Sequence, residues 1–130
     1  MKHLKVFTVL AFLFVANAVS AQSTFDKWPA IKEFHDVMSE TFHPAEKGNL
    51  APIKARSEEM MNKAALVVKL DIPAHFKTET ILAAAERLHA KSKALHELII
   101  AKGSDSDILK SITELHDVFH TIVDLCSDEK

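Results

Sequence analysis

The chain has 130 residues, of which 16 are Lys or Arg, 18 are Asp or Glu, and 48% are apolar. This length and composition are typical of a single globular domain. A lone cysteine cannot form a disulfide within the chain, two glycines cannot form a glycine-rich phosphate-binding loop, and a formal charge of −2 offers no basic surface for nucleic acid. Eight histidines are an unusually large share for so short a chain, and they are the feature that points to a function.

Residues 1–21 have the three parts of a secretory signal peptide. Two lysines form a basic start, residues 6–15 are an apolar run, and small residues end the segment at Ala21. The apolar run is too short to span a bilayer. We therefore expect cleavage between Ala21 and Gln22, and a mature domain of residues 22–130 that is periplasmic or secreted and inserts into no membrane.

Apolar residues at spacings of three and four predict four amphipathic helices, over residues 28–42, 50–67, 78–99 and 108–126. Pro44 is expected to stop the first helix, and Gly103 is expected to provide the left-handed cap that ends the third. Ser104 and Asp107 have the spacing of a capping box before the last helix. Short connections between helices of similar length predict an all-α fold, an antiparallel up-down-up-down four-helix bundle.

The helix patterns place three histidines at one height in this bundle. His116 and His120 are four residues apart and therefore share a helical face, where two imidazoles can grip one ion. Reflecting the chain about its loops brings His35, which falls in the apolar seam of the first helix, level with this pair. Three imidazoles suit transition metals rather than calcium or magnesium. The sequence thus predicts a metal site at these histidines, with copper or zinc as the ion.

Other residues are secondary candidates for the site. Met38 lies one turn after His35, and its thioether would favour copper, above all reduced copper. His89 of the third helix falls near the same height. His43 lies eight residues beyond His35, about 12 Å along a helix axis, so it cannot share the same ion unless the helix bends. We expect it in a solvated turn, with a separate site formed with Glu46 as the alternative.

No pattern in the sequence predicts an enzyme. The pairs Glu40 with His43 and Glu86 with His89 have the Glu-x-x-His spacing of di-iron bundles, but both glutamates fall on solvent-facing positions. No strand, turn and helix form a nucleophile elbow. Cys126 lies near the end of the last helix and is expected to be a small buried apolar residue.

Four segments carry a resemblance to known proteins, namely residues 34–38, 41–46, 48–52 and 116–120. In these segments the chain resembles a family of small exported helical proteins of the Bacteroidetes, which implies export and a helical fold but no activity. Its architecture is similar to that of periplasmic four-helix bundles, including soluble b-type cytochromes, cytochrome c-prime and metal-sensing bundles of cation-resistance systems. These bundles carry ligands on their first and last helices, which match Met38 or His35 and His116 here. Covalent c-type haem is excluded because Cys-x-x-Cys-His is absent.

Three functions remain open from the sequence. The first is a non-enzymatic periplasmic bundle that binds a transition metal for buffering, delivery or sensing, with a periplasmic metal-handling or redox protein as its partner. The alternative is b-type haem held by Met38 or His35 together with His116, for electron transfer. The third is an interaction module whose histidines are structural or respond to pH. The number and spacing of the histidines favour the first.

Overall fold

The computed structural model describes residues 22–128, and this part of the chain is helical with no strand. Four long helices account for most of it: α2 (Pro29–Glu46), α3 (Ala51–Lys69), α4 (Glu79–Ile100) and α5 (Asp105–Asp128). A short 3-10 helix, η1 (Ala74–Phe76), lies between α3 and α4, and residues 22–27 form a helical stretch before α2. The expected signal peptide lies outside the described residues. None of the helices within residues 22–128 is both long and apolar enough to cross a membrane.

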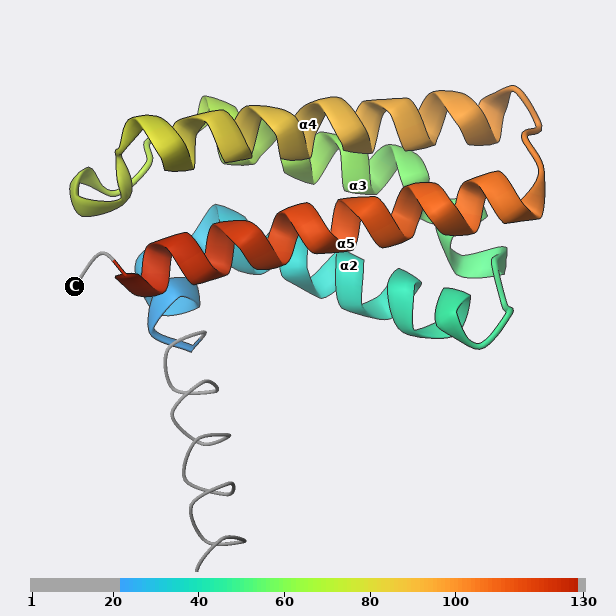
Figure 1. Ribbon diagram of the computed structural model, residues 1–130, viewed down its shortest axis with the longest axis horizontal. Coiled ribbons are helices and arrows are strands. Elements are labelled where there is room, and N and C mark those ends of the chain that lie inside the picture. The colour runs from blue at the N-terminus through green and yellow to red at the C-terminus, as the bar shows by residue number, and fades with distance from the viewer. Residues whose placement is uncertain (1–21, 129–130) are drawn as a thin grey trace, which may run out of the picture.

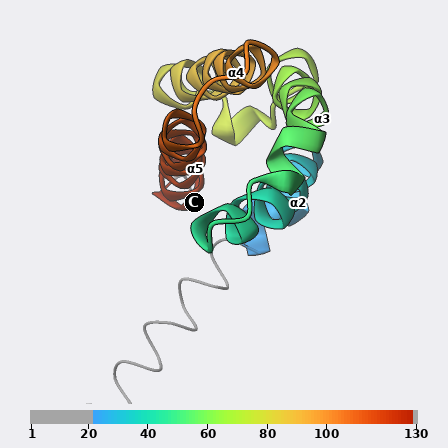
Figure 2. The ribbon, with the colours of Figure 1, turned by 90° about the vertical axis from the view of Figure 1, so that its right-hand side faces the viewer.

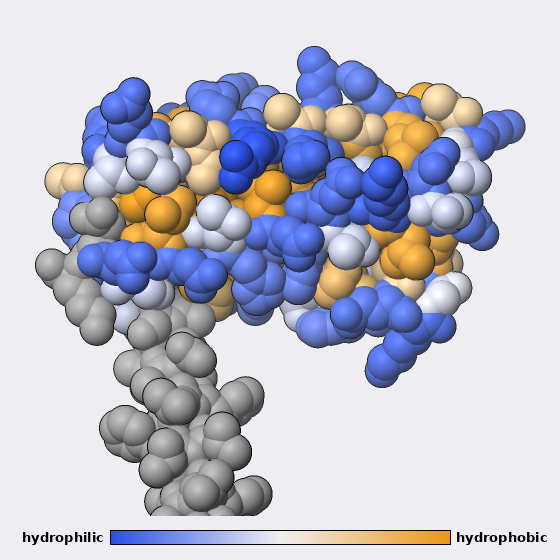
Figure 3. All heavy atoms as spheres, viewed as in Figure 1, coloured by the Kyte–Doolittle hydropathy of each residue, from blue (hydrophilic) through white to orange (hydrophobic). Residues whose placement is uncertain are grey.

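The four long helices lie around one apolar core (Figures 1 and 2). α3 packs against α2 and α4, and α5 packs against α4 and, less closely, against α2. Polar side chains cover much of the outer surface, with apolar patches between them (Figure 3). Burial of one large apolar side chain contributes roughly 1.5–3 kcal/mol, so the core holds the helices together. Its largest fully buried members are Trp28, Ile31, Phe34, Met38, Ile53, Met60, Ile81, Leu88, Leu95, Ile108, Ile112 and Leu115.

The predicted apolar seams of α3 and α4 are confirmed at most positions, whereas the seam of α2 is wrong at His35. Phe34 is fully buried, and His35 beside it is only half-buried. The physical reason is that burial of a phenyl ring stabilises the fold. Burial of an imidazole destabilises it unless the ring nitrogens have hydrogen-bond partners. Phe34 therefore faces the core, and His35 lies at the edge of the helix.

The prediction that Pro44 stops α2 is wrong, because the helix continues to Glu46. A proline in the last turn removes only one backbone hydrogen bond, and the carbonyls of this turn find other donors. The Asn49 N–H donates to the Pro44 carbonyl and the Gly48 N–H donates to the Ala45 carbonyl. These bonds form a Schellman motif, in which Gly48 takes the left-handed position at φ +90°.

The end of α4 has the same motif, but its left-handed residue is Lys102 rather than the predicted Gly103. The Lys102 N–H donates to the Ile99 carbonyl, and the Gly103 N–H donates to the Leu98 carbonyl. Gly103 is needed for a different reason, since a Cβ there would collide with the side chain of Leu98. The start of α5 matches the predicted cap, because the Ser104 hydroxyl accepts a bond from the backbone N–H three residues later.

Replacing Lys102 with glycine should raise the free energy of unfolding by about 1 kcal/mol, because glycine lacks the Cβ that is strained in the left-handed conformation. Urea denaturation measures the change. Lys47→Gly is the matched control, since Lys47 is also an exposed lysine at a helix end but has an ordinary φ of −92°. The control should be neutral or destabilising. Equal stabilisation by both variants would contradict this account of the α4 end.

Candidate functional site

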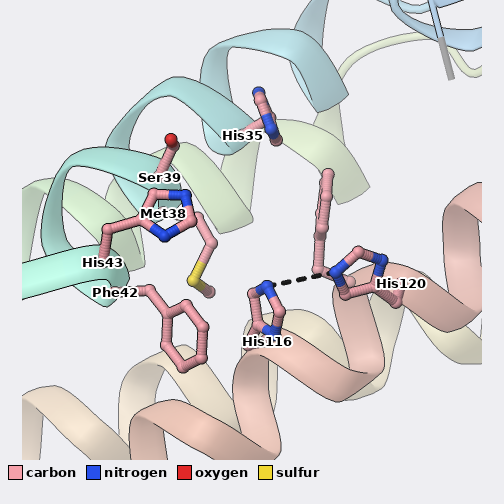
Figure 4. Close-up of a pocket in the computed structure, with 8 residues that line it drawn as sticks. His35, Met38, Ser39, Phe42, His43, His116 and His120 are labelled. Atoms are coloured by element: carbon pink, nitrogen blue, oxygen red, sulfur yellow. Dashed lines mark hydrogen bonds between the residues drawn. The ribbon is translucent and has the colours of Figure 1, made fainter. Parts of the chain in front are cut away.

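A groove with a volume of about 170 Å³ lies between α2 and α5 and is lined by four histidines (Figure 4). On each helix the lining residues recur every three or four positions, so each helix contributes one continuous stripe. The seam between α2 and α5 is the loosest in the bundle, which leaves this stripe accessible. The lining consists of His35, Met38, Ser39, Phe42 and His43 from α2, and His116, Phe119 and His120 from α5.

His116 and His120 form a direct pair within the groove. Their Nε2 atoms are 3.1 Å apart, and their rings meet edge to face at 81°. At this distance one nitrogen donates its hydrogen and the other accepts it. The two Nε2 atoms thus point toward each other on one face of α5, as the spacing of four residues predicts.

Aromatic rings hold the two half-buried histidines in place. Phe42 of α2 stacks on His116 of α5 with ring centroids 3.8 Å apart and an angle of 11°. His35 lies near the rings of Phe25 and Phe119, at centroid distances of 4.7 Å and 5.4 Å. The contacts of Phe42 with His116 and of His35 with Phe119 cross from α2 to α5. They therefore connect the two helices across their loose seam while they orient both imidazoles.

Burial lowers the pKa of both His35 and His116 below the ordinary value of 6.5. For His35 the nearby Asp36 opposes this effect, and for His116 the neighbouring His120 adds to it. Both rings are therefore mainly neutral at pH 7. The neutral imidazole is the form whose lone pair can bind a metal ion.

The structure brings one of the two secondary candidates to the groove. Met38 is almost completely buried in the core, and its sulfur points toward Phe42 and His116 (Figure 4). His89 of α4 is not among the residues that line the groove. A residue at the same height along the bundle reaches the groove only if its side chain points toward it, and that direction depends on its position around the helix.

His43 lies in the last turns of α2, exposed and two turns from His35, as its spacing predicts. It lines the same groove, and its Nδ1 also lies 3.5 Å from a carboxylate oxygen of Glu46. The groove extends over two turns of α2, which is the distance that separates His35 from His43.

The three-imidazole set His35, His116 and His120 is not assembled in this conformation. Among residues 22–128, no three His, Cys, Asp or Glu side chains are arranged closely enough to hold a metal ion. His35 lies across the groove from the other two histidines (Figure 4). The preassembled element is the pair on α5, surrounded by further nitrogen and sulfur donors from α2.

The remaining histidines have other surroundings. The Nδ1 atom of His96 on α4 lies 2.9 Å from the hydroxyl of Ser57 on α3, which is a structural hydrogen bond across that interface. His75 is exposed and contacts the ring of Phe76. Cys126 is buried, as expected, and does not line the groove. Glu40 and Glu86 are exposed, in agreement with their predicted solvent-facing positions.

A simple sequence signal could have identified the groove. Each groove histidine directly follows a large buried apolar residue, in the pairs Phe34–His35, Phe42–His43, Leu115–His116 and Phe119–His120. The residue after a core position lies about 100° around the helix, on one edge of the apolar face. The edges of α2 and α5 that carry these histidines line the same groove. His89 and His96 also follow buried leucines, but the contact of His96 with Ser57 shows that this edge of α4 faces α3.

Comparisons of the chain with family models, curated proteins and solved structures found no match. The resemblance to exported bundles of the Bacteroidetes and to periplasmic cytochromes and metal sensors stays a prediction. The function proposed below therefore rests on the residues that line the groove.

We expect the free energy of unfolding to fall as the pH decreases below 6.5, through the lowered pKa values of His35 and His116 in the folded state. Over this range the unfolded chain binds more protons than the folded one, so acid favours unfolding. Denaturation at pH 7.5 and 5.5 tests this for the wild type and His116→Gln, whose stability should depend less on pH. The groups that act on the two rings are Lys32, Asp36, His43, Glu46, Asp117 and His120.

His75→Gln is the control for this measurement, because His75 is exposed on η1 and lies outside the groove. It should retain the pH dependence of the wild type. The same pH dependence in wild type and His116→Gln would argue against a role for groove burial.

Proposed function

We propose that the protein binds a transition-metal ion of the copper or zinc class in the groove between α2 and α5. Its role would be to buffer, deliver or sense that ion, without catalysis. The observation that carries the proposal is the separation of 3.1 Å between the Nε2 atoms of His116 and His120.

This separation is close to that of two nitrogen ligands on one metal ion. With metal–nitrogen bonds of about 2.0–2.1 Å and a tetrahedral angle, two ligand nitrogens lie about 3.3 Å apart. The pair therefore needs only a small adjustment for an ion to lie between the two Nε2 atoms, once the hydrogen that they share has moved to Nδ1 of its own ring. Phe42 stacks on His116 and limits the positions that its ring can adopt, which reduces the entropy lost on binding.

The donors around the pair favour a borderline or soft ion. α2 contributes the imidazoles of His35 and His43 and the thioether of Met38 to the same groove. His43 is exposed, and exposed side chains change rotamer within nanoseconds, so its ring can approach the pair. No carboxylate lines the groove, and calcium and magnesium require oxygen ligands.

The same geometry favours an ion over b-type haem. The groove holds about 170 Å³, whereas pockets for cofactors and other small molecules hold roughly 300–1,000 Å³. Phe42 also lies directly on His116, at 3.8 Å between ring centroids. Because His116 is one of the proposed haem ligands and Phe42 is a buried core side chain, a porphyrin bound at His116 would also need room beside Phe42.

Export and the connectivity of the bundle belong to the same proposal. Loops at residues 47–50 and 101–104 join successive helices that run back and forth in Figure 1, which supports an antiparallel up-down-up-down bundle. The basic, apolar and small-residue parts of residues 1–21 support a signal peptide cleaved after Ala21. In the periplasm, a metal-handling or redox protein would be the partner that supplies or receives the ion.

Calorimetric titration of the purified protein with Zn²⁺ or Cu²⁺ should show one ion bound per chain. His116→Ala and His120→Ala should each weaken binding at least about 100-fold, since loss of a ligand costs more than loss of a group that merely supports one. His89→Ala is the matched control, because His89 is a half-buried histidine outside the groove. This variant should bind as the wild type does.

The proposal fails if the wild-type protein takes up neither zinc nor copper, with copper supplied in both of its oxidation states. It also fails if His89→Ala weakens binding as much as His116→Ala does, because the site would then lie outside the groove. Circular dichroism of each variant verifies that the helices remain folded.

A further inference from the structure

The lining of the groove offers only uncharged ligands. It contains imidazoles and one thioether, with no carboxylate and no thiolate. A Zn²⁺ ion held there would keep its charge of +2 beside the rings of Phe42 and Phe119, and an uncompensated charge next to apolar groups is unfavourable. The carboxylates of Glu46 and Asp117, which act on His116 from a distance, are exposed and lie outside the lining. An ion with a single positive charge suits this donor set better.

The sulfur of Met38 is the second observation. The residue is only 1% exposed, yet it lines the groove, and Figure 4 shows its sulfur directed toward Phe42 and His116. Most buried methionines simply fill space. Here the soft atom of the side chain is directed toward His116, one member of the histidine pair of α5. Soft thioether ligands select Cu(I).

The third observation concerns the number of ligands. The Nε2 atoms of His116 and His120 already lie together, and within residues 22–128 no group of three His, Cys, Asp or Glu side chains is in place to hold an ion. Zinc in structural sites is almost always four-coordinate, whereas monovalent copper is stable with fewer ligands. Two nitrogens and one sulfur complete a site for Cu(I) but leave a zinc site incomplete.

We propose that the ion bound in the groove is Cu(I), held by Nε2 of His116, Nε2 of His120 and the sulfur of Met38. This inference rests on the proposed function and specifies its ion. The copper binds in its reduced form and keeps that oxidation state, so no electron is transferred at the site.

The test is a competitive titration without oxygen, in which Cu(I) is supplied as its bicinchoninate complex and the loss of that complex's colour reports transfer to the protein. We expect one Cu(I) per chain and tighter binding than that of Zn²⁺. Met38→Leu, which conserves apolar volume, should weaken Cu(I) binding at least about tenfold and leave Zn²⁺ binding within about twofold.

Met60→Leu is the matched control, because Met60 is equally buried, lies on α3 and does not line the groove. It should leave the affinity for both ions unchanged. X-ray absorption at the copper edge provides a second measurement. The spectrum of the loaded wild type should contain a sulfur neighbour that disappears in Met38→Leu and persists in Met60→Leu.

The results separate this inference from the function on which it rests. If Zn²⁺ binds more tightly than Cu(I), or if Met38→Leu and Met60→Leu weaken Cu(I) binding equally, the assignment of Cu(I) is overturned. The metal site itself stands in that case, provided that His116→Ala still removes Zn²⁺ binding. If the wild type binds neither ion, both proposals fall.

Discussion

The stacking of Phe42 on His116 is the contact on which the histidine groove depends. α2 and α5 share no connecting loop, and they pack less closely than the other neighbouring helices. Phe42 is buried in the core, and its face covers the imidazole across the seam. The ring of His116 is consequently held at the groove, where His120 one turn later meets it through Nε2. Without this contact, the end of the groove near His43 would lack its main connection between the two helices.

The two edges of each helix carry different chemistry. Residues directly before a buried position form ion pairs, which join α2 to α3 and α4 to α5. Residues directly after a buried position include the groove histidines between α2 and α5. In these pairs the glutamates are exposed and the basic partners are half-buried, and ion pairs at the surface contribute roughly 0–1 kcal/mol each. The histidine edge has no such pair across its seam among the described residues, and the carboxylates next to its histidines, Asp36 and Glu46, lie on α2 itself. The ion pairs are Glu40 with Arg56, Glu33 with Lys63, and Glu114 with Lys91.

Burial has two linked effects at this site. It lowers the pKa of His35 and His116, and thereby makes protonation of the folded protein unfavourable. The same effect keeps the lone pairs of the rings available at neutral pH. If the rings of His35 and His116 were fully exposed, they would be protonated more readily and would lose their orientation to rotamer exchange, and if they were fully buried they would be closed to an ion. Half-burial at the seam lies between these limits.

The sequence by itself determined the four long helices, the apolar seams of α3 and α4, and the pairing of His116 with His120. These are local properties, because the helical repeat of 3.6 residues specifies which residues share a face whatever the rest of the chain does. Only the tertiary structure decided that Phe34 displaces His35 from the core, that His43 joins the groove and that His89 does not. Those outcomes depend on which edge of each helix meets which neighbour. That choice is made by packing between helices far apart in the chain, and no pattern within a single helix specifies it.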